Sequence, residues 1–180
     1  TIEEKIALES DPGKILALKE ELKAAKERLS ELGMKSEKLL SQLDGMPVDM
    51  HTEYEELFAD LLAISKSGNS RTIADSIGDG VNSARDPSIR RNPSEWMRRT
   101  NDNNPDDPHH TLAPTMSFVW HQYLGKGISR NERANVLEKV LLAIAKETDA
   151  RMSNPGLHDL PVNMRNDRLI EQIRQMISGS

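Results

Sequence analysis

Residues 12–46 carry apolar side chains at steps that alternate between three and four residues, and this spacing constrains the fold more than any other feature. The series is interrupted only by Ser36 and consists of Ile15, Leu18, Leu22, Ala25, Leu29, Leu32, Leu39, Leu43 and Met46. A heptad pattern of this kind predicts one long helix with a narrow apolar stripe. Charged side chains coat its other faces, so the stripe needs a partner helix from this chain or from another.

Sequence signals around this helix predict a hairpin with the segment that follows. Asp11 and Pro12 provide an N-cap acceptor followed by proline at the first helical position. A short turn that contains glycine and proline ends the helix. Thr52 with Glu55 three residues later is the pattern of a capping box, and the apolar face behind it ends near Gly68. Because the connection is short, we expect two antiparallel helices.

The charges divide the chain into two regions of different character. Residues 1–66 hold nine Lys and Arg against fifteen Asp and Glu (net −6), and residues 67–180 hold fifteen against fourteen (net +1). Eight of the nine cations in the first region are lysines, whereas twelve of the fifteen in the second are arginines. We therefore predict a coiled-coil-like helical hairpin over residues 1–68 and a helical bundle over residues 69–180, with a long loop at 100–113.

The second region contains helical patterns and no stretch that alternates with the period of a strand. Pro114 opens one helix, the capping box of Ser129 and Glu132 opens the strongest one, and a final helix follows Pro161. Phe, Trp and Tyr contribute only two residues each, and sheets favour aromatic and β-branched residues. The predicted fold class is therefore all-α: a long N-terminal helical hairpin followed by a compact bundle of shorter helices.

Composition excludes several classes of site. The chain has no cysteine, so disulfides, thiolate metal sites and cysteine nucleophiles are absent. No run approaches the eighteen apolar residues of a membrane span, which leaves a secreted or a cytoplasmic location. No glycine pattern of a phosphate-binding or dinucleotide-binding loop occurs, and we predict no cofactor. No motif covers enough of the chain to indicate a family.

The heptad stripe is the first candidate binding surface. It is either the core of an intramolecular hairpin or a seam for an oligomer or a protein partner, and the sequence leaves both interpretations open. The predicted seam residues are Ile15, Leu18, Leu22, Ala25, Leu29, Leu32, Leu39 and Leu43.

An arginine-rich segment, residues 85–99, is the second candidate, because it holds five arginines against two acids (net +3). Arginine forks bind phosphates, and an aromatic ring can stack on a base. The predicted surface for an anionic partner consists of Arg85, Arg90, Arg91, Trp96, Arg98 and Arg99. The isoelectric point of about 5.6 is low for a nucleic-acid-binding domain. The alternative is that these arginines pair with the acidic first region and dock the two halves.

One acidic and histidine-rich segment has residue types that bind metals, namely Asp102, Asp106, Asp107, His109 and His110, with His121 nearby. Aspartate and imidazole are ligands of zinc, manganese and iron. Adjacent residues of a loop rich in proline and asparagine seldom converge on one ion, however, so we favour a solvated loop. His121 fits a polar position beside the aromatic core better than a general base. We predict no metal site and no catalytic residue.

These features favour a non-enzymatic helical structural or adaptor protein that acts by self-association or by docking a protein partner. The lack of cysteine, the few aromatic residues and the polar middle loop also fit a secreted virulence or assembly subunit. The alternative function is a viral-type nucleic-acid-binding protein or nucleoprotein cofactor, in which the first region oligomerises and residues 85–99 contact RNA. A metal-dependent enzyme is a third hypothesis.

Overall fold

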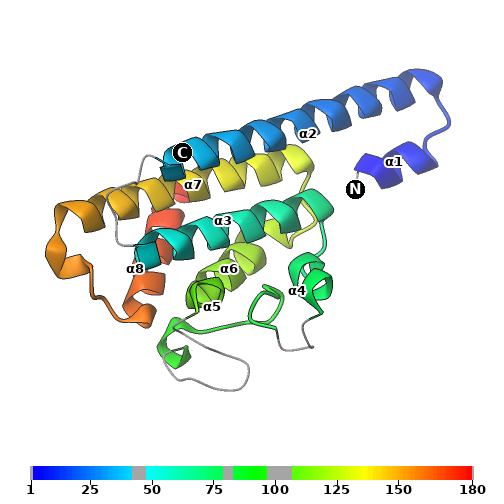
Figure 1. The fold of residues 1–180 in the computed structure, drawn as a ribbon. Coiled ribbons are helices and arrows are strands. Elements are labelled where there is room, and N and C mark those ends of the chain that lie inside the picture. The colour runs from blue at the N-terminus through cyan, green and yellow to red at the C-terminus, as the bar shows by residue number, and fades with distance from the viewer. Residues whose placement is uncertain (1, 42–47, 79–82, 97–106, 180) are drawn as a thin grey trace.

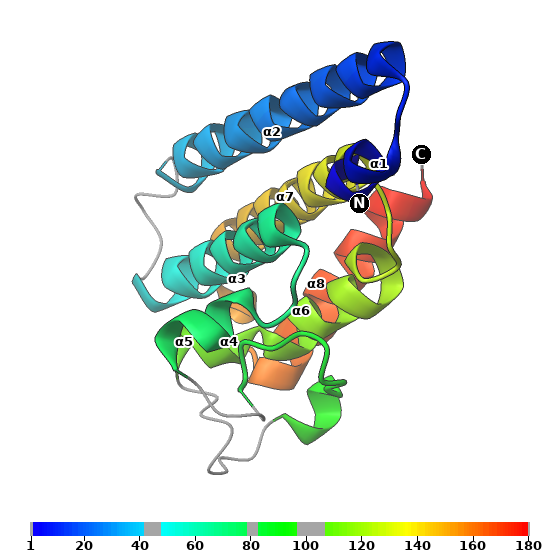
Figure 2. The same cartoon turned by 90° about the vertical axis from the view of Figure 1, so that its right-hand side faces the viewer.

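The computed structural model describes residues 2–41, 48–78, 83–96 and 107–179, and within them the chain is all-α, with no strand. The predicted all-α class is confirmed, and the helices form a compact bundle. Three long helices lie side by side: α2 (Pro12–Ser41), α3 (Val48–Ser67) and α7 (Arg130–Ser153) (Figure 1). Figure 2 shows three layers, with α2 on one side, α3 and α7 in the middle, and α6 (Ala113–Val119) with α8 (Val162–Ser178) on the other.

Short elements connect and extend this bundle. A two-turn helix, α1 (Ile2–Leu8), precedes α2 and packs against it. The short helices α4 (Thr72–Ile77) and α5 (Pro108–Thr111) both pack against α3. A π-helical turn at Trp120–Leu124 continues α6, and single 3-10 turns lie at Pro93–Glu95 and Pro155–Leu157.

A single hydrophobic cluster joins residues of both predicted regions. Its largest buried side chains include Leu29 of α2, Phe58 of α3, Met116 of α6, Leu137 of α7 and Ile173 of α8. All five elements bury apolar stripes at helical spacing, which is the main stabilising contribution to a bundle of this kind. Within the described residues, no helix combines the length and the apolar character needed to cross a bilayer.

Two of the three predicted N-terminal capping signals are confirmed. The Asp11 carboxylate accepts the backbone N–H of Gly13 at 2.8 Å. Ser129 accepts the N–H of Glu132 at 3.2 Å, while the Glu132 carboxylate accepts the N–H of Ser129 at 2.8 Å. The capping box predicted at Thr52 is wrong, because α3 begins four residues earlier, at Val48.

Among residues 12–35 of α2, the apolar stripe is fully buried only from Ala25 onward. Its buried members face α7 and α3 and are Ala25, Leu29 and Leu32. The N-terminal half of α2 extends with α1 beyond the end of the bundle (Figure 1), and there the stripe is only half-buried. One helix therefore serves both as a core element and as a projecting arm.

Replacing a leucine of the stripe by alanine should therefore lower the free energy of unfolding by different amounts at the two ends of the stripe. We expect Leu29→Ala to lower the free energy of unfolding by about 2–5 kcal/mol, because it leaves a cavity in the core. Leu18→Ala should cost about 1 kcal/mol or less, because its side chain keeps contact with water in the folded state. Urea titration followed by circular dichroism measures both losses, and equal losses would contradict the described burial.

Candidate functional site

The projecting arm, residues 5–24, contains the open half of the predicted seam. Ile15, Leu18 and Leu22 are half-buried there, whereas Leu39 and Leu43 lie outside the residues whose side chains the structure describes. Leu8 and Leu16 add to this apolar surface, with 87% and 60% of their side chains exposed. Large apolar side chains that gather on one exposed segment mark interaction surfaces more often than scattered ones do.

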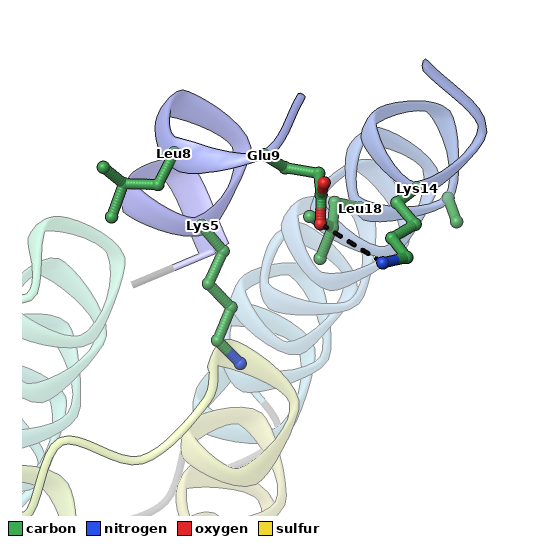
Figure 3. Close-up of a pocket in the computed structure, with 6 residues that line it drawn as sticks. Lys5, Leu8, Glu9, Lys14 and Leu18 are labelled. Carbon is green, nitrogen blue, oxygen red and sulfur yellow. Dashed lines mark ion pairs between the residues drawn. The ribbon is translucent and has the colours of Figure 1, made fainter. Parts of the chain in front are cut away.

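A groove of about 510 Å³ runs between α1 and α2 in this arm, and Figure 3 shows the side chains that surround it. Glu9 fixes the turn between the two helices. Its Oε1 accepts the backbone N–H groups of Ser10 and Asp11, each at 3.0 Å, and its Oε2 lies 3.8 Å from Nζ of Lys14. The lining residues are Lys5, Leu8, Glu9, Lys14, Ala17 and Leu18.

Arg85, the first of the predicted arginine group, binds the acidic first region of the chain. Its Nε donates to Oδ2 of Asp60 at 2.8 Å, its Nη2 pairs with Oδ1 of the same carboxylate, and Glu56 lies 3.6 Å away. Burial raises the pKa of Asp60, and the hydrogen bonds from Arg85 offset part of this effect. Arg85 thus makes the docking contact that the sequence offered as an alternative.

Arg91 and Trp96 hold residues 83–96 in place beside α5. The Arg91 guanidinium lies over the Trp96 ring, 5.3 Å from its centroid, and burial lowers the Arg91 pKa. The Trp96 indole N–H donates to the carbonyl of His110 at 2.9 Å. Arg91 also donates to three carbonyls of its own loop at 2.5–3.0 Å, those of Ser83, Asp86 and Ile89.

Arg90 lies at a second groove, of about 330 Å³, between this loop, the α6 segment and α8. Arg98 and Arg99 lie outside the described residues. The groove also contains Arg174 of α8, which the sequence analysis missed because it is far from residues 85–99 along the chain. Its lining residues are Arg90, Arg91, Pro93, Pro114, Ser117, Phe118, His121, Gln122, Asp167, Ile170 and Arg174.

A π-helical turn forms one wall of this second groove. The N–H of Gly125 donates to the carbonyl of Trp120 at 2.8 Å, which closes the wide turn. A Cβ on Gly125 would lie 2.8 Å from the Trp120 indole, so only glycine permits the ring to fold over this position. His121 donates from Nε2 to the carbonyl of Ser88 at 3.0 Å. Single π-helical turns occur frequently at functional sites.

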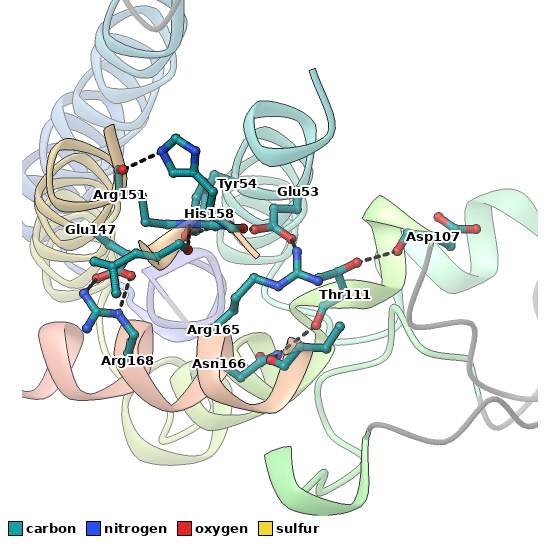
Figure 4. Close-up of polar contacts among 12 residues, drawn as sticks. Glu53, Tyr54, Asp107, Thr111, Glu147, Arg151, His158, Arg165, Asn166 and Arg168 are labelled. Atoms are coloured by element: carbon teal, nitrogen blue, oxygen red, sulfur yellow. Dashed lines mark hydrogen bonds and ion pairs between the residues drawn. The ribbon is translucent and has the colours of Figure 1, made fainter. Parts of the chain in front are cut away.

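A buried ionic network joins α8, which lines the groove, to α3 and α7 (Figure 4). Arg151 of α7 has no exposed surface and donates from Nη1 to Glu53 and to the Tyr54 hydroxyl of α3, each at 2.9 Å. Arg165 of α8 pairs with the other oxygen of Glu53. Arg151 also donates to the carbonyl of His158 at 3.0 Å.

Two further contacts fix α8 against its neighbours. Arg168 forms a bidentate pair with the buried Glu147 of α7, at 2.7 and 2.9 Å. The Asn166 amide oxygen accepts from the backbone N–H and the hydroxyl of Thr115, and its nitrogen donates to the carbonyl of Thr111 at 2.9 Å. Asp167 and Arg174, which lie on the same helix, therefore take defined positions at the groove.

Burial has the largest effect on the pKa values of Glu53 and Tyr54 in this network. It raises the pKa of Glu53, and the opposing effects of Arg165 and Arg151 only partly compensate. Burial also raises the pKa of Tyr54 to about 12, although the positive charge of Arg151 favours the phenolate.

The metal hypothesis gains no support from the described residues, in which no three His, Cys, Asp or Glu side chains gather around a common point. Asp107 accepts the N–H of His109 as the N-cap of α5, and the His109 ring lies 2.8 Å from Glu56. Asp102 and Asp106 lie outside the described residues.

Comparisons with protein-family models, with curated proteins and with solved structures find no match to this chain.

Tyr54 makes the stability of the bundle sensitive to alkaline pH. A folded-state pKa of about 12, against 10.0 for an ordinary tyrosine, means that the unfolded chain loses this proton first. The contribution of the Tyr54 hydroxyl to the free energy of unfolding is complete below pH 10. It declines by about 3 kcal/mol as the pH rises through the folded-state pKa. We expect Tyr54→Phe to lack this decline in a series of urea titrations between these pH values.

Tyr123→Phe is the matched control for removal of a tyrosine hydroxyl, because Tyr123 packs against Phe118 at the edge of the core. If the free energy of unfolding of Tyr54→Phe falls as steeply with pH as that of the wild type, Tyr54 is not the source of the decline.

Proposed function

We propose that this chain is a non-enzymatic helical structural or adaptor protein that self-associates through the open half of the α2 stripe. The observation that carries this proposal is that the heptad stripe is fully buried at Leu29 and Leu32 but only partly buried at Ile15, Leu18 and Leu22. Self-association is also what an assembly subunit, one of the classes that the sequence favours, requires.

A second copy of this chain fits the open stripe for a geometric reason. Side chains spaced alternately by three and four residues interdigitate with an identical series on a facing helix. Leu16 and Leu8, both largely exposed, widen the apolar surface that a second arm would cover. Removing such side chains from water favours association by about 25 cal/mol per Å² of apolar area.

The charges beside the stripe also permit this pairing. Lys14, Lys19 and Lys23 are exposed on the arm together with Glu20 and Glu21. Both signs are present, so two arms can approach without the barrier that a uniformly charged helix would meet. Exposed pairs of this kind influence orientation and contribute little affinity.

The contacts of the arginine segment favour this function over nucleic-acid binding. Arg85 pairs with Asp60, and Arg91 donates to backbone carbonyls and covers Trp96. These groups support the fold of the chain itself, which reduces the cationic surface left for a polyanion. A protein with a net charge of −5 also repels nucleic acid at long range.

Light scattering over a hundredfold concentration range tests self-association directly. We expect the mass to rise from the chain mass of 20.2 kDa to twice that value, at both low and high salt, because apolar contacts are not screened. Leu18→Lys should give a monomer at every concentration with unchanged helicity.

Leu142→Lys is the matched control, since Leu142 of α7 is half-exposed and lies outside the arm. It should dimerise as the wild type does. A wild-type protein that stays at the monomer mass throughout, or a Leu18→Lys variant that still dimerises, would refute the proposal.

A further inference from the structure

We propose that the groove between Arg90 and Arg174 binds the phosphate monoester group of a small organic ligand. This site is independent of the α2 arm, because its residues come from the loop at 88–93, the segment at 114–122 and α8. Three arginines and one aspartate line it, which gives a local charge of +2 on a chain whose net charge is −5.

Arg90 is the more available of the two cations. Its side chain is exposed, and within the described part of the chain no hydrogen bond or ion pair engages its guanidinium. Arg91, the next residue, is fixed by three carbonyls. The backbone that carries Arg90 is therefore held in place while the Arg90 side chain keeps all its donors for a ligand, which reduces the ordering cost of binding.

Arg174 faces the groove from α8 and is oriented by an aromatic ring. Its guanidinium lies over Phe118, 4.9 Å from the ring centroid. Its ion pair with Glu171 is 3.6 Å long and more than half exposed on both sides, so this pair competes only weakly with an incoming anion. A guanidinium that stacks on a ring presents its N–H groups at its edge, where a phosphate accepts two of them.

The charge of the site favours a phosphate monoester over a carboxylate. A monoester carries about −1.5 to −2 charges at neutral pH and three acceptor oxygens. A carboxylate ligand carries a single charge, which makes it a weaker match for a local charge of +2. Asp167 also repels either anion, and the doubly charged group retains the larger net attraction.

The walls leave room for an organic body attached to the phosphate. Pro93, Pro114, Phe118 and Ile170 supply apolar surface beside the two arginines, and the Gln122 amide adds a polar group on the π-helical turn. A volume of about 330 Å³ lies at the lower end of small-molecule sites. A ring or a short carbon chain fits this space beside the phosphate.

Isothermal titration at low salt with phenyl phosphate, glycerol phosphate and inorganic phosphate tests the site. We expect saturable binding of one phenyl phosphate per chain. Glycerol phosphate and inorganic phosphate should bind more weakly, and benzoate, the carboxylate counterpart of phenyl phosphate, should bind most weakly of all. Arg90→Gln and Arg174→Gln should each raise the dissociation constant about tenfold, as expected for one lost charged hydrogen-bond donor.

Lys146→Gln serves as the control, because it removes one exposed positive charge from α7 and leaves the groove intact. It should bind phenyl phosphate as the wild type does, and all variants should keep their helicity. Absence of saturable binding would overturn the proposal. Equal weakening by Lys146→Gln would also overturn it, because that result indicates attraction by overall charge alone.

Discussion

The arrangement of this bundle depends on Arg151, a charged side chain that is fully buried from water. An unpaired charge at such a position costs several kcal/mol, and even a paired one contributes little net stability. Glu53, Tyr54 and the carbonyl of His158 satisfy the guanidinium only when α3, α7 and the turn before α8 take one relative position. We therefore expect the network to act mainly on the specificity of helix packing. The apolar cluster supplies most of the stability.

Local signals in the sequence predict most of this fold, and contacts between distant residues account for what they miss. The Ser129 and Glu132 capping box was predictable because both partners lie within one helical turn. The error at Thr52 has the opposite origin: the neighbouring Glu53 is buried against Arg151, 98 residues away, and α3 continues through the predicted start. The sequence likewise placed Arg90 on a candidate surface, but it could not bring Arg174 beside it.

The arginines show why counts of charge are a poor guide to a binding site. Residues 85–99 have a net charge of +3, yet Arg85 neutralises Asp60 and Arg91 serves as a rigid crosslink between carbonyls. What remains available is set by which donors the fold leaves unused. In the groove, the available donors belong to Arg90, a member of the predicted group, and to Arg174 of α8.

The difference in burial between residues 12–24 and residues 25–35 of α2 has a consequence for its local stability. Isolated helices of about 13 residues are marginal in water, and the stripe side chains of residues 12–24 are only partly buried. Their amide hydrogens should exchange with solvent much faster than those around Leu29, whose opening requires disruption of the core. Any partner that covers the arm must first hold it helical, so association and the local folding of this segment form one equilibrium.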